Sequence, residues 1–146
     1  MTLASLLQEY ENRFPRNGAF ELRRGEQIQT RAKEERGPEE AWVYLIYSRR
    51  GRKRELLYVG KAGTLRQDGS LKDQKLPGRI RNRRKGMRSQ QYYQLQFQQH
   101  GFDALPFRWF VTYAGNVGII PAKAEADLLQ AFFDDTGRLP LWNDAL

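Results

Sequence analysis

Two apolar segments joined by a short basic stretch constrain the fold of this chain most strongly. Residues 41–48 read AWVYLIYS and residues 55–60 read ELLYVG. Aromatic and β-branched side chains dominate both segments, which is typical of strands. The connecting residues 49–54 contain Gly51, and a connection this short joins two strands only as an antiparallel hairpin. The sequence therefore predicts a β-hairpin at the start of the core.

A third strand and four helices are predicted around this hairpin. The strand covers residues 106–114, where aromatic and β-branched side chains alternate along the sequence PFRWFVTYA. Helices are expected at residues 2–14, 78–88, 89–100 and 121–135, with glycines at 101 and 137 where the last two end. These elements predict an α+β fold.

One domain accounts for the length of 146 residues. We expect an N-terminal helix and a loosely ordered polar arm over residues 1–40, with a short strand near residues 20–22, and a folded domain over residues 41–146. Glu9 and Glu11 do not fit a secretory signal, and no apolar stretch is long enough to span a membrane. The absence of cysteine excludes disulfides and zinc fingers, so a cytoplasmic protein is expected.

The net charge of +8 is concentrated in two clusters of a single sign. Residues 49–54 read RRGRKR and residues 78–88 read GRIRNRRKGMR, without an acid in either. Clusters of this kind favour a polyanionic partner over a merely soluble basic surface, which is the simpler alternative. The expected nucleic-acid contacts are Arg49, Arg50, Arg52, Lys53, Arg54, Arg81, Arg83, Arg84, Lys85 and Arg88.

Glu125 stands on the apolar stripe of the predicted C-terminal helix. It lies three and four residues before Leu128 and Leu129, and seven and eight before Phe132 and Phe133, so it faces inward with them. An inward carboxylate needs a cation, hydrogen-bond donors or a raised pKa. It serves either to cap backbone N–H groups at the helix start or to bind a ligand, and position alone leaves both open.

Two tyrosines and a lysine gather at the predicted hairpin. Tyr44 and Tyr58 are placed to be neighbours on one face of the sheet, where packing with satisfied hydroxyls is the ordinary explanation. Lys61 follows the second strand between glycines. The stretch GKAG has neither the upstream glycine nor the Ser/Thr of a nucleoside-triphosphate loop. Hydroxyls, cations and one carboxylate are the groups that bind a phosphodiester, hold one Mg²⁺ and activate water.

In their order along the chain, these residues resemble the GIY-YIG nuclease family over residues 41–143. The pieces that carry the resemblance are WVY in the first strand, YVGKA at the end of the second, GRIRNR after it, then Glu125 and Asn143. YVGKA is similar to the wording of the restriction and excision-repair branches. The resemblance implies a small three-stranded antiparallel sheet flanked by helices.

The resemblance also implies a role for each matched residue. Tyr44 would help to deprotonate the attacking water, and Tyr58 would contact the phosphate. Arg79 would neutralise the scissile phosphate, with Arg81 and Arg83 as open alternatives. Glu125 would be the single metal ligand, and Asn143 would support the site. One glutamate suffices for Mg²⁺ or Mn²⁺, since Mg²⁺ keeps several water and phosphate ligands.

Departures from the family pattern are also visible. Trp42 replaces the glycine of the first motif, and Arg83 stands where many members have a histidine four residues after the arginine. A free tyrosine has a pKa of about 10, so Tyr44 acts as a base only if a nearby cation lowers that value. Lys61 is placed to do so.

The sequence thus predicts a metal-dependent endonuclease that hydrolyses phosphodiester bonds in DNA. The alternative is a catalytically weak or inactive nucleic-acid-binding module of the same fold, which the missing histidine favours. Cleavage of both strands by one site requires two successive nicks or a homodimer, so a homodimer is also considered.

Overall fold

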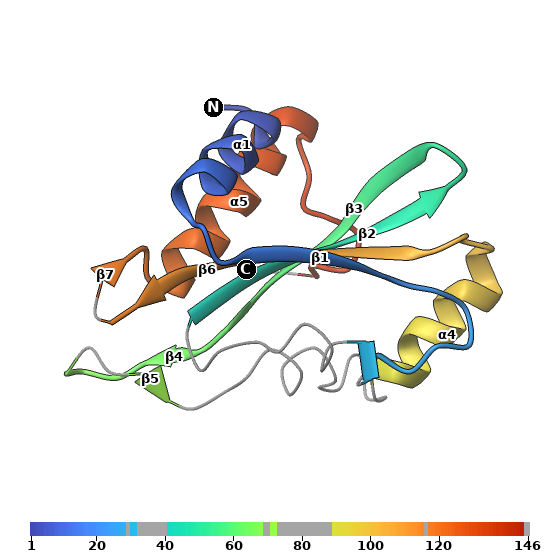
Figure 1. Ribbon diagram of the computed structural model, residues 1–146. Helices are drawn as coiled ribbons and strands as arrows, with labels where there is room; N and C mark the ends of the chain where they lie inside the picture. The colour runs from blue at the N-terminus through green and yellow to red at the C-terminus, as the bar shows by residue number, and fades with distance from the viewer. Residues whose placement is uncertain (29, 32–40, 69–70, 73–88, 116, 145–146) are drawn as a thin grey trace.

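The computed structural model describes residues 1–28, 30–31, 41–68, 71–72, 89–115 and 117–144 (Figure 1). The predicted helix at residues 78–88 therefore lies outside the described residues. The elements are α1 (Leu3–Arg13), β1 (Asn17–Leu22), β2 (Ala41–Arg50), β3 (Lys53–Ala62), β4 (Thr64–Leu65), β5 (Leu71–Lys72), α4 (Ser89–His100), β6 (Leu105–Ala114), β7 (Val117–Gly118) and α5 (Pro121–Thr136).

The main sheet is antiparallel throughout, in the order β1-β6-β2-β3, and β7 pairs with the end of β6. The α+β class predicted from the sequence is confirmed. The three predicted strands are β2, β3 and β6, but within the described residues the sheet also includes β1 and β7. Without β1, one side of β6 would be an edge of unpaired backbone groups, which sheets tend to cover.

The predicted hairpin is confirmed, and its strands are longer than expected. The last residue pair is Arg50 with Lys53, so the turn consists of Gly51 and Arg52 alone. Gly51 has φ +58°, the positive value that the first position of a two-residue hairpin turn requires. Most cations of the basic stretch therefore belong to the strands, where they alternate between the two faces.

The N-terminal segment is more ordered than the polar arm predicted for it. β1 pairs with β6 from Asn17 opposite Phe110 to Leu22 opposite Leu105, and Ile28 is buried. α1 packs against α5. The polar composition was misleading because β1 needs only alternate apolar residues, Phe20 and Leu22, to cover one side of the sheet. Residues 32–40 lie outside the described part of the chain.

Each face of the sheet carries its own apolar core. We call one side the α4 face, which includes Trp42, Tyr44, Ile46 and Trp109 and packs against Tyr93 and Phe97 of α4. The other is the α5 face, which includes Val43, Leu45, Val59 and Phe110 and packs against α1 and α5. Figure 1 shows α1 and α5 on one side of the sheet and α4 on the other.

The three long helices begin and end where the sequence predicts. Thr2 accepts a hydrogen bond from the backbone N–H of Ser5 at the start of α1, Gly101 follows α4 with φ +64°, and Gly137 ends α5 with φ +74°. Among the described residues, no helix combines the length and apolar character needed to cross a membrane.

The inward stripe of α5 differs from the predicted one at its end. Phe133 is 47% exposed, whereas Ala124, Leu128 and Ala131 are buried. The small alanines bring the helix axis close to the sheet, which turns the stripe away from Phe133. Glu125 stays within the arc of buried positions and is half-buried.

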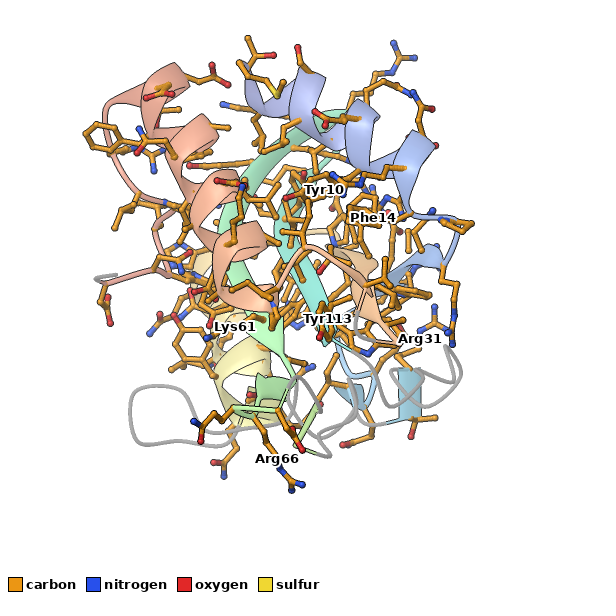
Figure 2. The ribbon with its side chains drawn as sticks, turned by 90° about the vertical axis from the view of Figure 1, so that its left-hand side faces the viewer. Tyr10, Phe14, Arg31, Lys61, Arg66 and Tyr113 are labelled. Atoms are coloured by element: carbon orange, nitrogen blue, oxygen red, sulfur yellow. The ribbon has the colours of Figure 1, made fainter. Side chains whose placement is uncertain are left out.

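Tyr10 on α1 carries a hydroxyl that is buried without a hydrogen-bond partner among the described residues. Its ring packs edge-on against Phe14 and Phe110 at centroid distances of 5.2 and 5.7 Å (Figure 2). Burial, and secondarily the negative charges of Asp127 and Glu9, raise the pKa of Tyr10 to about 12. The folded protein therefore holds this proton more tightly than the unfolded chain does.

The free energy of unfolding should consequently fall as the pH rises from 10 towards 12, by at most about 1.4 kcal/mol per pH unit from this residue. Tyr10→Phe removes the unpaired hydroxyl and its titration. We expect the variant to equal the wild type at pH 8 or to exceed it by up to about 1 kcal/mol, and to lose less stability at pH 11. Urea unfolding at both pH values measures this, and an unchanged pH dependence would contradict it.

Candidate functional site

The two tyrosines that the sequence singles out lie together on the α4 face. Tyr44 is on the central strand β2, opposite Gly60 on β3. Tyr58 is paired with Ile46, two residues along the same ladder. The ring centroids of Tyr44 and Tyr58 are 5.9 Å apart, with the planes tilted by 43°. The predicted proximity of the two tyrosines is confirmed.

A β-bulge on β3 places Tyr58 on this face. Ile46 pairs with Tyr58 and Tyr47 pairs with Leu56, so Leu57 has no opposite residue on β2. Leu57 and Tyr58 consequently both pack with the α4 face, while Leu56 and Val59 on either side pack with the α5 face. In an unbroken ladder, adjacent residues would point to opposite faces. Bulges of this kind re-aim a side chain, and they are enriched next to active sites.

Gly60 makes room for both tyrosine rings. A Cβ atom at this position would lie 2.5 Å from Cε2 of Tyr58, 2.6 Å from Cζ of Tyr44 and 2.7 Å from its Oη. These separations are far below van der Waals contact. The YVGKA motif therefore requires glycine at position 60 for a steric reason, because the hydroxyl end of Tyr44 lies across the backbone of β3.

Gly60→Ala should push the two rings apart and destabilise the protein by roughly 1–3 kcal/mol, the usual cost of overpacking. Gly101→Ala is the matched control, since Gly101 has φ +64° but no atom within 4 Å of the added methyl. We expect that control to cost about 1 kcal/mol from the backbone alone. Equal denaturant midpoints for the two variants would show that the crowding at Gly60 is relieved without cost.

Asn143 holds the outer edge of β3 at the same level. Its Oδ1 accepts from the N–H of Val59 at 2.9 Å, and its Nδ2 donates to the carbonyl of Val59 at 3.0 Å. The N–H of Trp142 donates to the carbonyl of Leu57 at 2.8 Å. The tail thus completes the ladder that β3 would otherwise leave open, directly between Tyr58 and Gly60. This position fits the supporting role that the resemblance implies.

Asn143→Ala leaves both backbone groups of Val59 without their partner and should cost about 1–3 kcal/mol. Amide hydrogen exchange at Val59 should accelerate because the N–H loses its acceptor. Leu141→Ala is the control, since this side chain of the same tail is 59% exposed. Unchanged exchange at Val59 would mean that Asn143 does not protect this edge.

Lys61 on β3 and Glu125 on α5 belong to the α5 face of the sheet, opposite the two tyrosines. Lys61 pairs with Val43, whose side chain belongs to the α5 face, so the Cβ of Lys61 points there too. α5 packs against β3, and Figure 2 shows Lys61 on β3 near the N-terminal end of that helix. Glu125 is on the second turn of α5, after a first turn without acids. The structure therefore forms two groups at one end of the sheet, the tyrosines on one face and Lys61 with Glu125 towards the other.

Burial sets what these groups can do. Tyr44 is 1% exposed, whereas Tyr58, Lys61 and Glu125 are half-buried. Glu125 is the predicted metal ligand, and among the described residues no three His, Asp or Glu side chains gather at one point. A Mg²⁺ ion bound there would draw most of its ligands from water and phosphate. Glu125 alone would therefore bind Mg²⁺ only together with phosphate oxygens of a substrate.

The cations of the hairpin divide into two groups. Arg49 donates twice to Glu21, at 3.1 and 3.3 Å, and Arg50 donates to the carbonyl of His100 at 2.7 Å. Arg54 lies 3.6 Å from Glu21 with a side chain that is 55% exposed. Arg52 and Lys53 at the turn are exposed, and their side chains form no hydrogen bond or ion pair with a described residue. Among the hairpin cations predicted to contact nucleic acid, Arg49, Arg50 and Arg54 thus also have contacts within the protein.

The remaining predicted contacts, including the catalytic arginine, lie outside the described residues. These are Arg79, Arg81, Arg83, Arg84, Lys85 and Arg88. One cation that the sequence reading missed is described, namely Arg66 after β4. It is exposed and points away from the sheet in Figure 2. A single arginine in a polar loop gives no signal that could have identified it.

Trp109 is the other neighbour that the sequence reading did not connect to the site. It lies opposite Tyr44 on β6, and its ring centroid is 4.4 Å from that of Trp42. Its Nε1 is buried and has no hydrogen-bond partner among the described residues. Only the pairing of β2 with β6, which no local pattern reveals, places Trp109 beside Tyr44.

Comparisons with protein-family models, with curated proteins and with solved structures found no match to this chain.

Proposed function

We propose that this chain is a metal-dependent endonuclease that hydrolyses DNA phosphodiester bonds. The observation that carries the proposal is the packing of Tyr44 and Tyr58 against Gly60 at a bulge in β3. A strand that only stabilised a core would need neither the extra residue nor the glycine. Both features cost stability, and such costs concentrate at functional sites.

The roles of the residues follow from where they lie. Tyr58 is half-buried, and we assign to it the contact with a phosphate oxygen. Lys61, next to Gly60, would supply positive charge at one end of β3. The exposed Arg52 and Lys53 are at the turn, at the other end of this strand, and would contact a separate part of the DNA backbone. A Mg²⁺ ion held by Glu125 would stabilise negative charge on the phosphate. Asn143 keeps β3 in place beneath these groups.

A supercoiled plasmid incubated with Mg²⁺ tests the proposal. The wild type should produce nicked or linear DNA, and EDTA should stop the reaction. Glu125→Gln should lower the rate at least about 100-fold because the metal ligand is lost. Asp134→Asn on the exposed side of the same helix is the matched control and should retain full activity. Equal rates for wild type and Glu125→Gln, or no cleavage of any DNA by the wild type, would refute it.

The burial of Tyr44 favours a second candidate, a nucleic-acid-binding module without catalysis. A general base must reach the water that it activates, and Tyr44 is 1% exposed. This candidate predicts DNA binding that weakens steeply with salt and is unaffected by EDTA or by Glu125→Gln. The same plasmid assay would then show no nicking at protein concentrations at which the DNA is fully bound.

A further inference from the structure

A groove on the α5 face, far from the tyrosine pair, has the chemistry of a binding site. Its volume is about 410 Å³, within the range of small-molecule sites. Its walls come from α1, β1, β6 and the hairpin half of β2 and β3. In Figure 1, α1 and α5 lie over one part of this side of the sheet, and the hairpin extends beyond them. The tyrosine pair is on the opposite face, so this groove is separate from the proposed nuclease site.

Two guanidinium groups and one hydroxyl converge in the groove. Arg54, Arg108 and Tyr47 all line it, and the positive charges of the two arginines oppose the effect of burial on the pKa of the Tyr47 hydroxyl. Burial is the larger influence and raises that pKa, so at neutral pH the hydroxyl keeps its proton and is a hydrogen-bond donor. Tyr47 makes no hydrogen bond through this hydroxyl to any described residue. A donor between two arginines is arranged for an anion.

Arg108 is held in position before any ligand arrives. It donates to the carbonyl of Gly18 at 2.9 Å, and its guanidinium carbon lies 4.3 Å from the ring centroid of Phe110. These contacts use only part of its donor set, because a guanidinium carries five N–H groups. A fixed guanidinium loses little entropy on binding, which favours recognition of a phosphate.

The acids near the groove do not cancel this charge. Glu21 lines the groove and accepts from Arg49 through both carboxylate oxygens, while Arg54 lies 3.6 Å from the same carboxylate. Two arginines thus face this one acid, which leaves a net positive charge in the cluster. Glu11 lies at the rim on α1 and is exposed. The rest of the wall is apolar, with Leu7 on α1 and Pro106 on β6 among its members. The groove thus has a cationic part and an apolar part side by side.

We propose that this groove binds a nucleotide, with the phosphate at Arg54, Arg108 and Tyr47 and the base against the apolar wall. Arginine forks match phosphate oxygens, while a flat base fills an apolar slot that inorganic phosphate would leave empty. A free nucleoside monophosphate and the phosphorylated end of a DNA strand share this chemistry. The proposal does not depend on the nuclease proposal, because none of the groups assigned to catalysis or metal binding lines this groove.

Isothermal titration of the full chain with deoxyadenosine monophosphate tests the proposal, with inorganic phosphate and a 5′-phosphorylated tetranucleotide as parallel probes. Arg54→Gln should raise the dissociation constant for the nucleotide at least about ten-fold, since Arg54 is exposed enough to be replaced without unfolding. Arg24→Gln is the control, since Arg24 is an exposed arginine outside the lining of the groove, and it should leave the dissociation constant unchanged. Tighter binding of the tetranucleotide than of the monophosphate would identify a strand end as the ligand, and the reverse would identify the free nucleotide.

The proposal would be overturned by no binding of either nucleotide probe at millimolar concentration, by equal weakening by Arg54→Gln and Arg24→Gln, or by inorganic phosphate binding as tightly as the nucleotides. Tyr47→Phe provides a second test, because it removes the donor and keeps the ring. It should weaken nucleotide binding several-fold and leave the urea midpoint unchanged. Retained nucleotide affinity in Tyr47→Phe would likewise overturn the proposal. Tyr44→Phe should leave nucleotide binding intact, which separates this groove from the proposed nuclease site.

Discussion

The pairing of β2 with β3 is the interaction on which the rest of this structure depends. β2 lies at the centre of the sheet, and β3 is the strand through which Tyr58, Gly60, Lys61 and the contact with Asn143 are all positioned. A single extra residue, Leu57, decides which face receives Tyr58. Because side chains alternate with a period of two, a shift of one residue in this ladder would transfer every one of these groups to the wrong face.

The structure separates the functions that the sequence had placed in one cluster. Tyr44 and Tyr58 belong to the α4 face, and Lys61 and Glu125 belong to the side covered by α5. They meet only at the end of the sheet, near the edge strand. A substrate that engaged both groups would therefore lie along this edge, where β3 is closed by the tail and not by another strand. The tail is consequently part of the candidate site and not only of the core.

Charge on this protein serves packing as well as recognition. Arg49 donates to Glu21 of β1, and Arg50 donates to the carbonyl of His100 at the end of α4. These two cations therefore help to attach the hairpin to the neighbouring elements. Arg52 and Lys53 are exposed, and their side chains make no hydrogen bond or ion pair with a described residue. A dense basic stretch in a strand divides in this way because alternate positions face alternate sides. The net charge by itself overstates the positive surface offered to a polyanion.

The sequence by itself determined the hairpin, the three long helices with their ends, and the proximity of Tyr44 to Tyr58, because each follows from local periodicity, end residues or a short connection. Tertiary structure alone decided the pairing of β1 with β6, the bulge at Leu57 and the contact of Asn143 with Val59. These features depend on backbone groups that a distant segment satisfies, and such groups are the same in every residue. No side-chain pattern in the sequence could therefore predict these features.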